Sequence, residues 1–226
     1  MNKICVSFPP KDVEETLNLI RKAEKNRADF IEVRLDSLDQ HRELEEITNS
    51  TDIPLIATNR STKCQGHFTG SEEERKKILL DAAKKGFDYV DLELSTQGLK
   101  DMVTNLRKTE AKPIISFHNF DATPPLSRLK EVLQKQMDSG AHICKIVTTA
   151  KSLEDNLKIL DFVSQASKKA KVICFCMGNL GKPSRLLSPI FGAFFTIASL
   201  DSARKTASGQ LTFQQMKTIY NTLEMK

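Results

Sequence analysis

Short apolar runs alternate along this chain with longer segments in which apolar residues recur every three or four positions. The short runs are rich in isoleucine, valine and phenylalanine, and they have the length of buried strands. They span Ile4–Phe8, Phe30–Leu35, Pro54–Thr58, Tyr89–Leu94, Pro113–Phe117, Ile143–Val147, Val172–Cys176 and Ala193–Ile197. The pattern therefore predicts strands that alternate with helices along the whole chain.

The longer segments carry apolar stripes with helical spacing. The stripes consist of Val13, Leu17, Ile20 and Ala23; of Ile78, Leu79 and Ala82; of Leu129, Val132, Leu133 and Met137; of Leu153, Leu157, Leu160 and Val163; and of Phe213, Met216, Ile219 and Leu223. Two helix-start signals agree with this pattern. Ser71 with Glu74 three residues later forms a capping box, and Ser152 precedes the sixth helix.

Eight strand–helix units in 226 residues are the number that a (β/α)8 barrel requires. We therefore predict an α/β fold, a TIM barrel, that forms a single compact domain over residues 1–226. The alternative is an open doubly wound sheet, which usually has a glycine-rich turn after its first strand. The residues at that place, Ser7-Phe8-Pro9-Pro10, include no glycine.

Composition narrows the class of protein. A hydrophobic content of 39% and a charged content of 28% are typical of soluble globular proteins. No signal-peptide core precedes the first strand, and the longest apolar stretch, Ile190–Leu200, is too short to span a bilayer. The five cysteines lack the paired spacing of a zinc site, and their odd number fits reduced thiols. We expect a cytoplasmic protein with no membrane partner and no metal.

The net charge of +5 is modest and is spread along the chain, mostly on the predicted helices. The chain has no tryptophan and two tyrosines, and it does not interleave aromatic with basic residues as nucleic-acid-binding surfaces do. Nucleic acid is therefore not an expected partner. A small anionic substrate agrees better with this charge.

Lys145 lies inside the strand-like run Ile143–Val147. A buried ammonium must be paired or lose its proton, and a deprotonated lysine is a nucleophile that forms Schiff bases with ketones. We expect neighbouring guanidiniums and partial burial to lower the pKa of Lys145. His118 directly follows the preceding apolar strand, where it could transfer protons beside that amine.

Alternate side chains of a strand point to opposite faces, and this predicts which residues converge inside the barrel. In the second strand, Glu32, Arg34 and Asp36 lie opposite the apolar face. Further polar residues occur toward the ends of the next strands: Thr58 and Arg60, then Asp91 and Glu93, then Ser116 and His118. In such barrels the carboxyl ends of the strands carry the active site.

These residues also have purely structural interpretations. The acids of the fourth strand could be counter-ions for Arg34 and Arg60, and His118 could be a hydrogen-bonded core histidine. Lys145 could lie at the edge of an open sheet, although a closed barrel has no such edge. Taken together, an amine, an imidazole and several guanidiniums favour an anionic carbonyl substrate.

Six motifs occur in order at the carboxyl ends of predicted strands. They are Glu32-Val33-Arg34-Leu35-Asp36; Arg60; Ser116-Phe117-His118-Asn119-Phe120; Lys145-Ile146; Met177-Gly178 with Gly181 and Ser184-Arg185; and Thr206-Ala207-Ser208-Gly209-Gln210. With these motifs the chain resembles type I 3-dehydroquinate dehydratase, the Schiff-base-forming enzyme of the shikimate pathway. The resemblance implies conversion of 3-dehydroquinate to 3-dehydroshikimate without a cofactor, and it suggests a homodimer.

The resemblance also implies a role for each candidate site residue. Lys145 would form the iminium with the ring ketone, and His118 would transfer protons. The substrate-binding residues would be Glu32, Arg34 and Arg60 at the ring hydroxyls and the carboxylate region, Arg185 at the carboxylate, Ser7 at the pocket floor, and Thr206 and Gln210 in the last loop.

Three positions depart from the family pattern. Cys64, followed by Gln65, stands where the family usually has an acid. Asn119 replaces the usual aspartate after the histidine, and Ser208 replaces a proline. An acid beside an imidazole orients the ring and stabilises its protonated form. We expect His118 to work without such an acid and to have a lower pKa than in relatives that carry it. In the alternative, Asp91 or Glu93 of the fourth strand supplies the negative charge.

Two other functions stay open on the sequence alone. A class I aldolase also uses a barrel lysine and an iminium, but it commonly binds phosphate through glycine-rich turns, whereas Arg185 and Gln210 suit a carboxylate better. A non-catalytic barrel could bind an anionic metabolite as a sensor, although the presence of both Lys145 and His118 argues against it.

Overall fold

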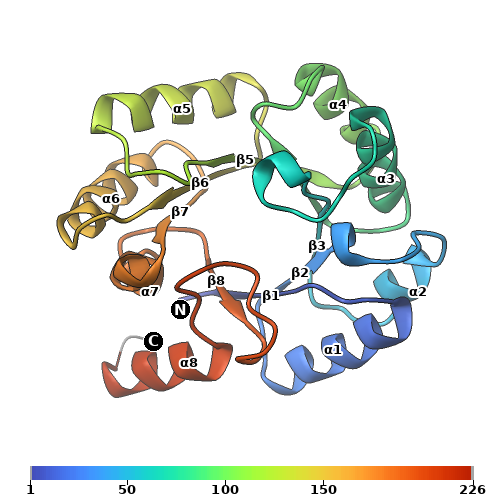
Figure 1. Ribbon diagram of the computed structural model, residues 1–226, viewed down its shortest axis with the longest axis horizontal. Helices are drawn as coiled ribbons and strands as arrows, with labels where there is room; N and C mark the ends of the chain where they lie inside the picture. Colours follow the sequence, from blue (N-terminus) through green and yellow to red (C-terminus); the bar gives the residue numbers. More distant parts are fainter. Residues whose placement is uncertain (1, 225–226) are drawn as a thin grey trace.

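Parallel strands form the centre of the molecule and helices surround them, as the computed structural model of residues 2–224 shows (Figure 1). The strands are β1 (Ile4–Phe8), β2 (Phe30–Arg34), β3 (Leu55–Thr58), β4 (Tyr89–Glu93), β5 (Lys112–His118), β6 (Ile143–Thr149), β7 (Val172–Met177) and β8 (Thr196–Ser199). The helices are α1 (Val13–Lys25), α2 (Leu44–Thr48), α3 (Glu72–Lys84), α4 (Leu99–Leu106), α5 (Leu126–Asp138), α6 (Glu154–Ala166), α7 (Lys182–Leu187) and α8 (Phe213–Thr222). The predicted TIM barrel is confirmed.

The barrel is nearly closed. Its strands are hydrogen-bonded in the order β7-β6-β5-β4-β3-β2-β1-β8, with parallel neighbours throughout. No ladder joins β7 to β8 within residues 2–224, but the backbone N–H of Phe194 donates to the carbonyl of Val172 over 2.7 Å. The β7–β8 side is therefore a seam, and α7 crosses from one strand to the other there.

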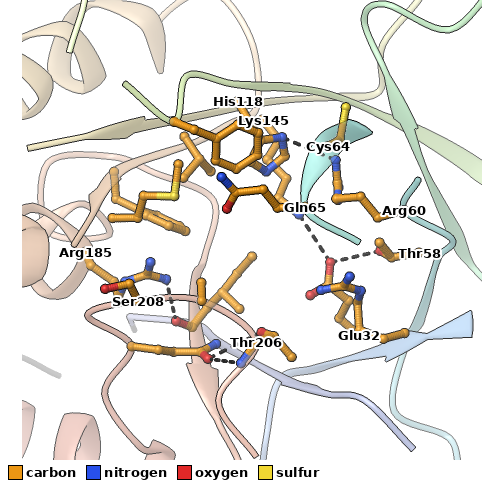
Figure 2. Close-up of a pocket in the computed structure, with 18 residues that line it drawn as sticks. Glu32, Thr58, Arg60, Cys64, Gln65, His118, Lys145, Arg185, Thr206 and Ser208 are labelled. Atoms are coloured by element: carbon orange, nitrogen blue, oxygen red, sulfur yellow. Dashed lines mark hydrogen bonds and ion pairs between the residues drawn. The ribbon is translucent and has the colours of Figure 1, made fainter. Parts of the chain in front are cut away.

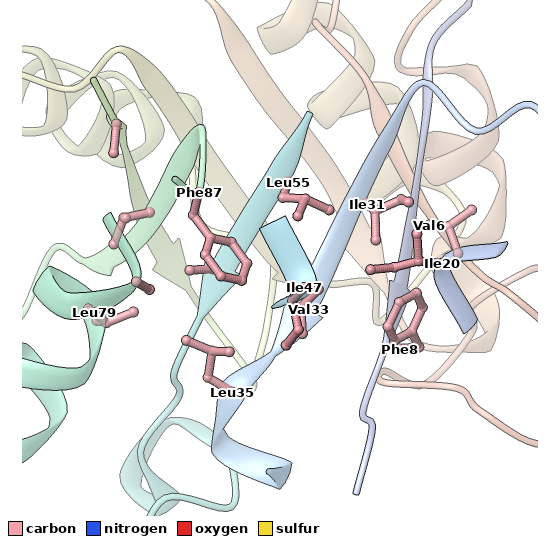
Figure 3. Packing of buried hydrophobic residues seen from close by; sticks show 14 of the residues in the cluster. Val6, Phe8, Ile20, Ile31, Val33, Leu35, Ile47, Leu55, Leu79 and Phe87 are labelled. Atoms are coloured by element: carbon pink, nitrogen blue, oxygen red, sulfur yellow. The ribbon is translucent and has the colours of Figure 1, made fainter. Parts of the chain in front are cut away.

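The alternation of side chains explains why the core and the site separate. The outward residues of β1 to β3, such as Val6, Ile31 and Val33, pack against the surrounding helices (Figure 3). On β6, Cys144 and Ile146 face the helices in the same way, as predicted. Because successive side chains of a strand point to opposite faces, the residues between these outward-facing ones point into the barrel.

The inside of the barrel is apolar at its amino-terminal end. Phe30 packs against Phe195 with ring centroids 4.7 Å apart, and against Tyr89 with centroids 6.0 Å apart. Ile143 belongs to the same buried interior cluster. These side chains fill the lower layers, so the polar interior residues are gathered toward the carboxyl ends of the strands.

Local signals fix several helix starts. The capping box of Ser71 and Glu74 is present at the start of α3, as predicted. At α1 the side chain of Asp12 caps the first turn by accepting from the backbone of Glu15. Ser152 does precede α6, but its side chain does not cap the helix; Asp155 instead accepts backbone N–H groups from Lys151 and Ser152.

Two sequence-based expectations about packing were wrong. The last strand runs over Thr196–Ser199 and not over Ala193–Ile197, because Phe194 and Phe195 pack against Phe30 at the amino-terminal end of the barrel before the strand begins. Of the predicted stripe, Leu160 and Val163 are buried, but Leu157 of α6 and Leu153 just before the helix are 69% and 60% exposed. Buried residues of this helix include Ile159 and Phe162. An apolar run or stripe alone does not tell which of its residues are covered.

Within residues 2–224, none of the helices has both the length and the apolar character needed to cross a membrane.

Candidate active site

A cavity of about 130 Å³ opens at the carboxyl ends of the strands (Figure 2). Most of the predicted site residues line it. The lining consists of Glu32, Arg34, Thr58, Arg60, Cys64, Gln65, His118, Phe120, Lys145, Val147, Phe175, Met177, Arg185, Ile197, Thr206, Ala207, Ser208 and Gln210. The fold therefore brings residues from both halves of the chain to one small cavity, lined by charged and apolar side chains together.

Lys145 is held between two carboxylates. Its Nζ lies 2.8 Å from Oδ2 of Asp91 and 3.2 Å from Oε1 of Glu32. Burial alone lowers the pKa of Lys145, but these two acids outweigh it and raise the pKa above its ordinary value. The expectation of a lowered pKa was wrong, because acids rather than guanidiniums contact the amine. The resting residue is an ammonium.

The two carboxylates stay ionised in spite of their burial. Burial alone raises the pKa of Asp91. The charges of Arg60 and Lys145 lower it by more than burial raises it, so the pKa lies well below the ordinary value. Burial likewise raises the pKa of Glu32, and the nearby Lys145 reverses the shift. Thr58 donates to Glu32 over 2.9 Å. The site therefore holds fixed negative charge beside the position where an iminium cation would form.

His118 is half-buried at the end of β5, and its ring stacks on Phe120 with centroids 5.8 Å apart and an interplanar angle of 12°. Nη1 of Arg60 lies 3.3 Å from Nδ1 of this ring. Burial, Arg60 and Lys145 hold the pKa of His118 well below its ordinary value, and Asp91 opposes this shift only in part. The ring is therefore neutral at pH 7, the state in which an imidazole can accept a proton.

Arg185 presents unpaired donors to the cavity. The residue is only 2% exposed, and its guanidinium lies 4.2 Å from the ring centroid of Phe175. Nη1 donates to the carbonyl of Ile197 over 3.2 Å, whereas Nε and Nη2 find no hydrogen-bond partner among the described residues. Burial lowers the pKa of Arg185 to about 10. Buried donors without partners are costly, and an anionic ligand group would satisfy them.

The loop after β8 covers this side of the cavity. The backbone N–H of Gly178 donates to the carbonyl of Ser208 over 3.1 Å. Gly209 has φ +73°, and a Cβ there would lie 2.0 Å from the carbonyl oxygen of Gly178, so this close approach requires glycine. Gln210 accepts from the backbone of Thr206 over 2.8 Å, which leaves its own Nε2 without a partner in the described part of the chain.

Two predicted site residues are placed differently from the others. Ser7 is buried and does not appear in the cavity lining of the described chain; its Oγ lies 3.3 Å from Oγ1 of Thr206. Arg34 lines the cavity but already binds Asp36 through Nε and Nη2, over 2.8 and 2.6 Å. Arg34 thus already has a counter-ion in Asp36, two residues later in the chain.

The sequence of residues 4–226 matches the family described as Type I 3-dehydroquinase. The chain belongs to the type I 3-dehydroquinase family. The 3-dehydroquinate dehydratase of Dehalococcoides mccartyi is 41% identical over 196 residues, which cover 87% of this chain and 86% of the relative. The 3-dehydroquinate dehydratase of Desulfotalea psychrophila is 36% identical over 225 residues and is matched over 96% of both chains.

Solved structures of 3-dehydroquinate dehydratases share the fold. The enzyme from Clostridium difficile, solved with covalently modified comenic acid, is 26% identical and superposes with a TM-score of 0.88 over 99% of this chain and 92% of that chain. The 3-dehydroquinate dehydratase of Geobacillus kaustophilus is 24% identical and superposes with a TM-score of 0.90 over 100% of this chain and 92% of that chain.

Within this type I 3-dehydroquinase, no carboxylate of the described residues is hydrogen-bonded to His118. Arg60 binds both acids of the fourth strand, with 2.9 Å from Nη2 to Asp91 and 3.3 Å from Nη1 to Glu93. Burial and the nearby Glu93 raise the pKa of the Cys64 thiol, so this side chain is neutral as well. The geometry therefore supports the expectation that His118 works without an acid of its own.

Three aromatic and basic residues contribute to the site although sequence reasoning assigned them no role. Phe120 was part of a quoted motif, but its stacking on His118 was not foreseen. Phe175 gave no usable signal, because its partner Arg185 lies on another element. Arg75 pairs with Glu72 of its own helix, but its contacts toward the site are with other elements and gave no signal. Arg75 of α3 is almost fully buried and donates to the carbonyl of Asn59 and to Thr96. It also lies 3.5 Å from Glu93, so it supports the acid that Arg60 binds.

Replacing Arg185 by lysine should weaken substrate binding by roughly 10- to 100-fold, because one ammonium cannot supply the paired donors of a guanidinium. Imine formation should still occur at high substrate concentration, since Arg185 does not contact Lys145 in the described structure. Substrate affinity measured by the concentration dependence of imine trapping checks this. An unchanged affinity would show that another residue binds the carboxylate. Arg128→Lys, at an exposed pair with Glu131, is the matched control.

Proposed function

We propose that this protein is a 3-dehydroquinate dehydratase, a carbon–oxygen lyase of the shikimate pathway, and that it acts through a Schiff base on Lys145. The observation that carries the proposal is the pairing of two features in one small cavity. One is a buried amine between two ionised carboxylates, and the other is the buried guanidinium of Arg185 with unpaired donors. Family membership supports the same substrate.

The first stage joins the amine to the ring ketone. Lys145 must lose a proton before its nitrogen attacks the carbonyl carbon, and loss of water from the adduct then gives an iminium. Asp91 and Glu32, which make the free amine scarce, are placed to stabilise this cation. The carboxylates thus slow the attack but favour the intermediate.

The second stage removes water from the ring. The iminium withdraws electrons from the neighbouring C–H bond, so the neutral ring of His118 can take its proton. The electron pair shifts into the iminium, and its return expels the hydroxyl, which leaves as water with the proton that His118 carries. Hydrolysis of the remaining imine releases 3-dehydroshikimate and restores the amine. The protein's own amine serves as the electron sink, and the steps use no metal or organic cofactor.

The remaining predicted residues bind the substrate in this proposal. Arg185 holds the carboxylate, and Gln210 offers its unpaired amide N–H groups beside it. Glu32, Arg34 and Arg60 line the cavity where the ring hydroxyls and the carboxylate region would lie. Ser7 and Thr206 act together, since their hydroxyls are 3.3 Å apart, and Ser7 supports Thr206 from below the cavity.

The proposal is tested by incubating the protein with 3-dehydroquinate and borohydride, followed by peptide mapping with mass spectrometry. We expect turnover without borohydride and, with it, a reduced adduct on the segment Cys144-Lys145-Ile146. An adduct on another lysine, or turnover without any trappable imine, would reject the mechanism. Binding without turnover or imine would favour a sensor, and cleavage of a phosphorylated substrate would favour an aldolase.

Replacing Asp91 by asparagine should move the pH dependence of imine formation to lower pH. Below the pKa of Lys145 the free-amine fraction rises about tenfold per pH unit. Removing the carboxylate at 2.8 Å lowers that pKa, so more free amine is present at pH 7. Dehydration itself should slow, because the iminium loses a counter-charge. Rapid quenching with cyanoborohydride across pH 5–9 measures the first effect. An unmoved profile would contradict it, and Asp101→Asn on the exposed face of α4 is the control.

We also propose a single catalytic domain over residues 1–226, a homodimer and a cytoplasmic location. Exposed leucines on and beside α6, namely Leu153, Leu157 and Leu180, support an interface there. Five free thiols fit a reducing compartment.

Light scattering should give twice the mass of one chain, and Leu157→Glu should halve the measured mass. A wild-type monomer would reject the dimer.

A further inference from the structure

We propose that Arg60 holds the resting His118 in the tautomer that carries its proton on Nε2, and that bound substrate frees the ring by drawing the Arg60 guanidinium away. Arg60 is then a positioning residue that makes the base available only in the substrate complex. This inference rests on the proposed function for its second half, whereas the tautomer of the free protein does not depend on it.

The proton positions follow from the contact between the two side chains. Nη1 of Arg60 lies 3.3 Å from Nδ1 of His118, and Figure 2 shows the two groups facing each other. A guanidinium nitrogen can only donate a hydrogen bond, so Nδ1 must accept and carries no proton. A neutral imidazole has one N–H, which must then be on Nε2.

Arg60 keeps its charge in this position. Burial lowers the pKa of Arg60, but Asp91 and Glu93 outweigh burial and raise it. Besides Arg60 after β3, the charges of Lys145 on β6 and Arg34 on β2 lower the pKa of His118, and the charge of Asp91 on β4 raises it. Cations outnumber the acid among these groups, and the neutral Cys64 adds no charge. A second proton on His118 is therefore disfavoured, and the neutral Nε2–H ring is the resting form.

A ring in this form cannot act as the base. Nε2 already carries a proton, so it can only donate. Nδ1 has a free electron pair, but the N–H of Arg60 occupies it, and a proton placed there would face a cation. For Nε2 to take the proton from the substrate, the ring's own proton must first move to Nδ1, and the contact with Arg60 must break before that.

The hydrogen bond between Arg60 and His118 is weak. Nη1 of Arg60 has two hydrogens for three acceptors, and its distances are 3.3 Å to Glu93, 3.3 Å to His118 and 3.5 Å to Ser116. Nη2, in contrast, makes a 2.9 Å bond to Asp91. Long, shared hydrogen bonds are weak. An oxygen of an anionic substrate in the same cavity would compete well for Nη1, while Nη2 stays bound to Asp91.

The chemical identity of position 64 explains why Arg60 can take this role. A carboxylate near the ring would accept a proton from Nδ1 and select the opposite tautomer. Here the thiol of Cys64 is neutral, and Glu93 is bound by Arg60 and lies 3.5 Å from Arg75. The guanidinium is therefore the group left to set the tautomer of His118.

Long-range ¹H–¹⁵N correlation of the imidazole rings tests the proposal, because the two tautomers have different nitrogen shifts. The chain has four histidines, so His118→Gln assigns the signal of His118 by its loss. We expect the Nε2–H form in the free protein. We expect this form to give way to Nδ1–H, or to an exchanging mixture, when quinate, which has an alcohol in place of the substrate ketone, fills the site.

Two variants separate the hydrogen bond from the effect of charge. Arg60→Met removes the donor and should shift free His118 toward Nδ1–H, with a higher pKa for the ring. Arg34→Met removes a nearby cation that is bonded to Asp36 and should leave the tautomer unchanged while also raising the pKa. An Nδ1–H ring in the free wild-type protein would overturn the proposal. So would an Nε2–H ring that persists in Arg60→Met or with quinate bound.

The wild-type spectra alone decide the proposal if Arg60→Met fails to fold. The result is also independent of turnover, since quinate cannot form an imine. A protein that does not dehydrate 3-dehydroquinate would reject the proposed function, yet the tautomer of free His118 would still be read. The two failures are therefore distinguishable.

Discussion

Replacing Lys145 by methionine should abolish dehydration of 3-dehydroquinate, with a loss in kcat on the order of 10⁴- to 10⁶-fold. The variant keeps most of the side-chain volume but has no nitrogen to form the iminium, so the neighbouring C–H bond is no longer acidified. Asp91 keeps Arg60 as a partner at 2.9 Å, so the carboxylate is not left without a cation. Steady-state turnover measures the loss, and borohydride trapping should give no adduct.

Lys171→Met is the control for this variant. Lys171 is an exposed lysine just before β7 and outside the cavity lining, so full activity is expected. Circular dichroism should show that Lys145→Met is folded. Residual activity above one per cent in a folded Lys145→Met protein would show that the reaction does not need the imine, and the proposed mechanism would be wrong.

Replacing His118 by glutamine should lower kcat by roughly 10²- to 10⁴-fold, the usual size of general acid–base catalysis. Imine formation does not require this ring as the covalent group, so the iminium should still form and should accumulate, because its next step is blocked. Glutamine fills similar space beside Phe120 and can still accept a hydrogen bond from Arg60. Single-turnover kinetics with borohydride quenching measures both effects.

His142→Gln is the matched control, since His142 lies just before β6 at the opposite end of the barrel and contacts Lys171. It should retain wild-type kcat. If His118→Gln reduced imine formation and dehydration by the same factor, the ring would act before the iminium forms. The assignment of His118 to the C–H step would then be wrong.

Much of the fold could be predicted from the chain because the alternation of side chains is a local property. Glu32 and Arg34 face inward since Ile31 and Val33 pack outward, and this follows from neighbouring residues alone. The last strand was misplaced because Phe194 and Phe195 are as apolar as strand residues, but they pack against Phe30 at the amino-terminal end of the barrel before the strand begins. Burial of a stripe likewise depends on what covers it, which a single helix does not reveal.

The chemistry of the site was less predictable, since it depends on which charges end up closest. A role as counter-ion for Arg34 or Arg60 was one interpretation of Asp91, and it does pair with Arg60, but it also lies 2.8 Å from Lys145. Together with the contact to Glu32, this contact reverses the direction of the pKa shift of Lys145. The stacking of Arg185 on Phe175 joins α7 to the neighbouring strand β7, and the sequence pattern gave no sign of this pair.

The unpaired donors of Arg185 also bear on how long the protein lasts in a cell. Each buried N–H without a partner costs roughly 1–3 kcal/mol in the empty protein, and a bound carboxylate would remove that cost. Ligands that bind only the folded state raise its population by mass action. Molecules that are starved of substrate would therefore unfold and reach proteases more often than working ones. The abundance of the enzyme would then follow metabolic supply without any change in its synthesis.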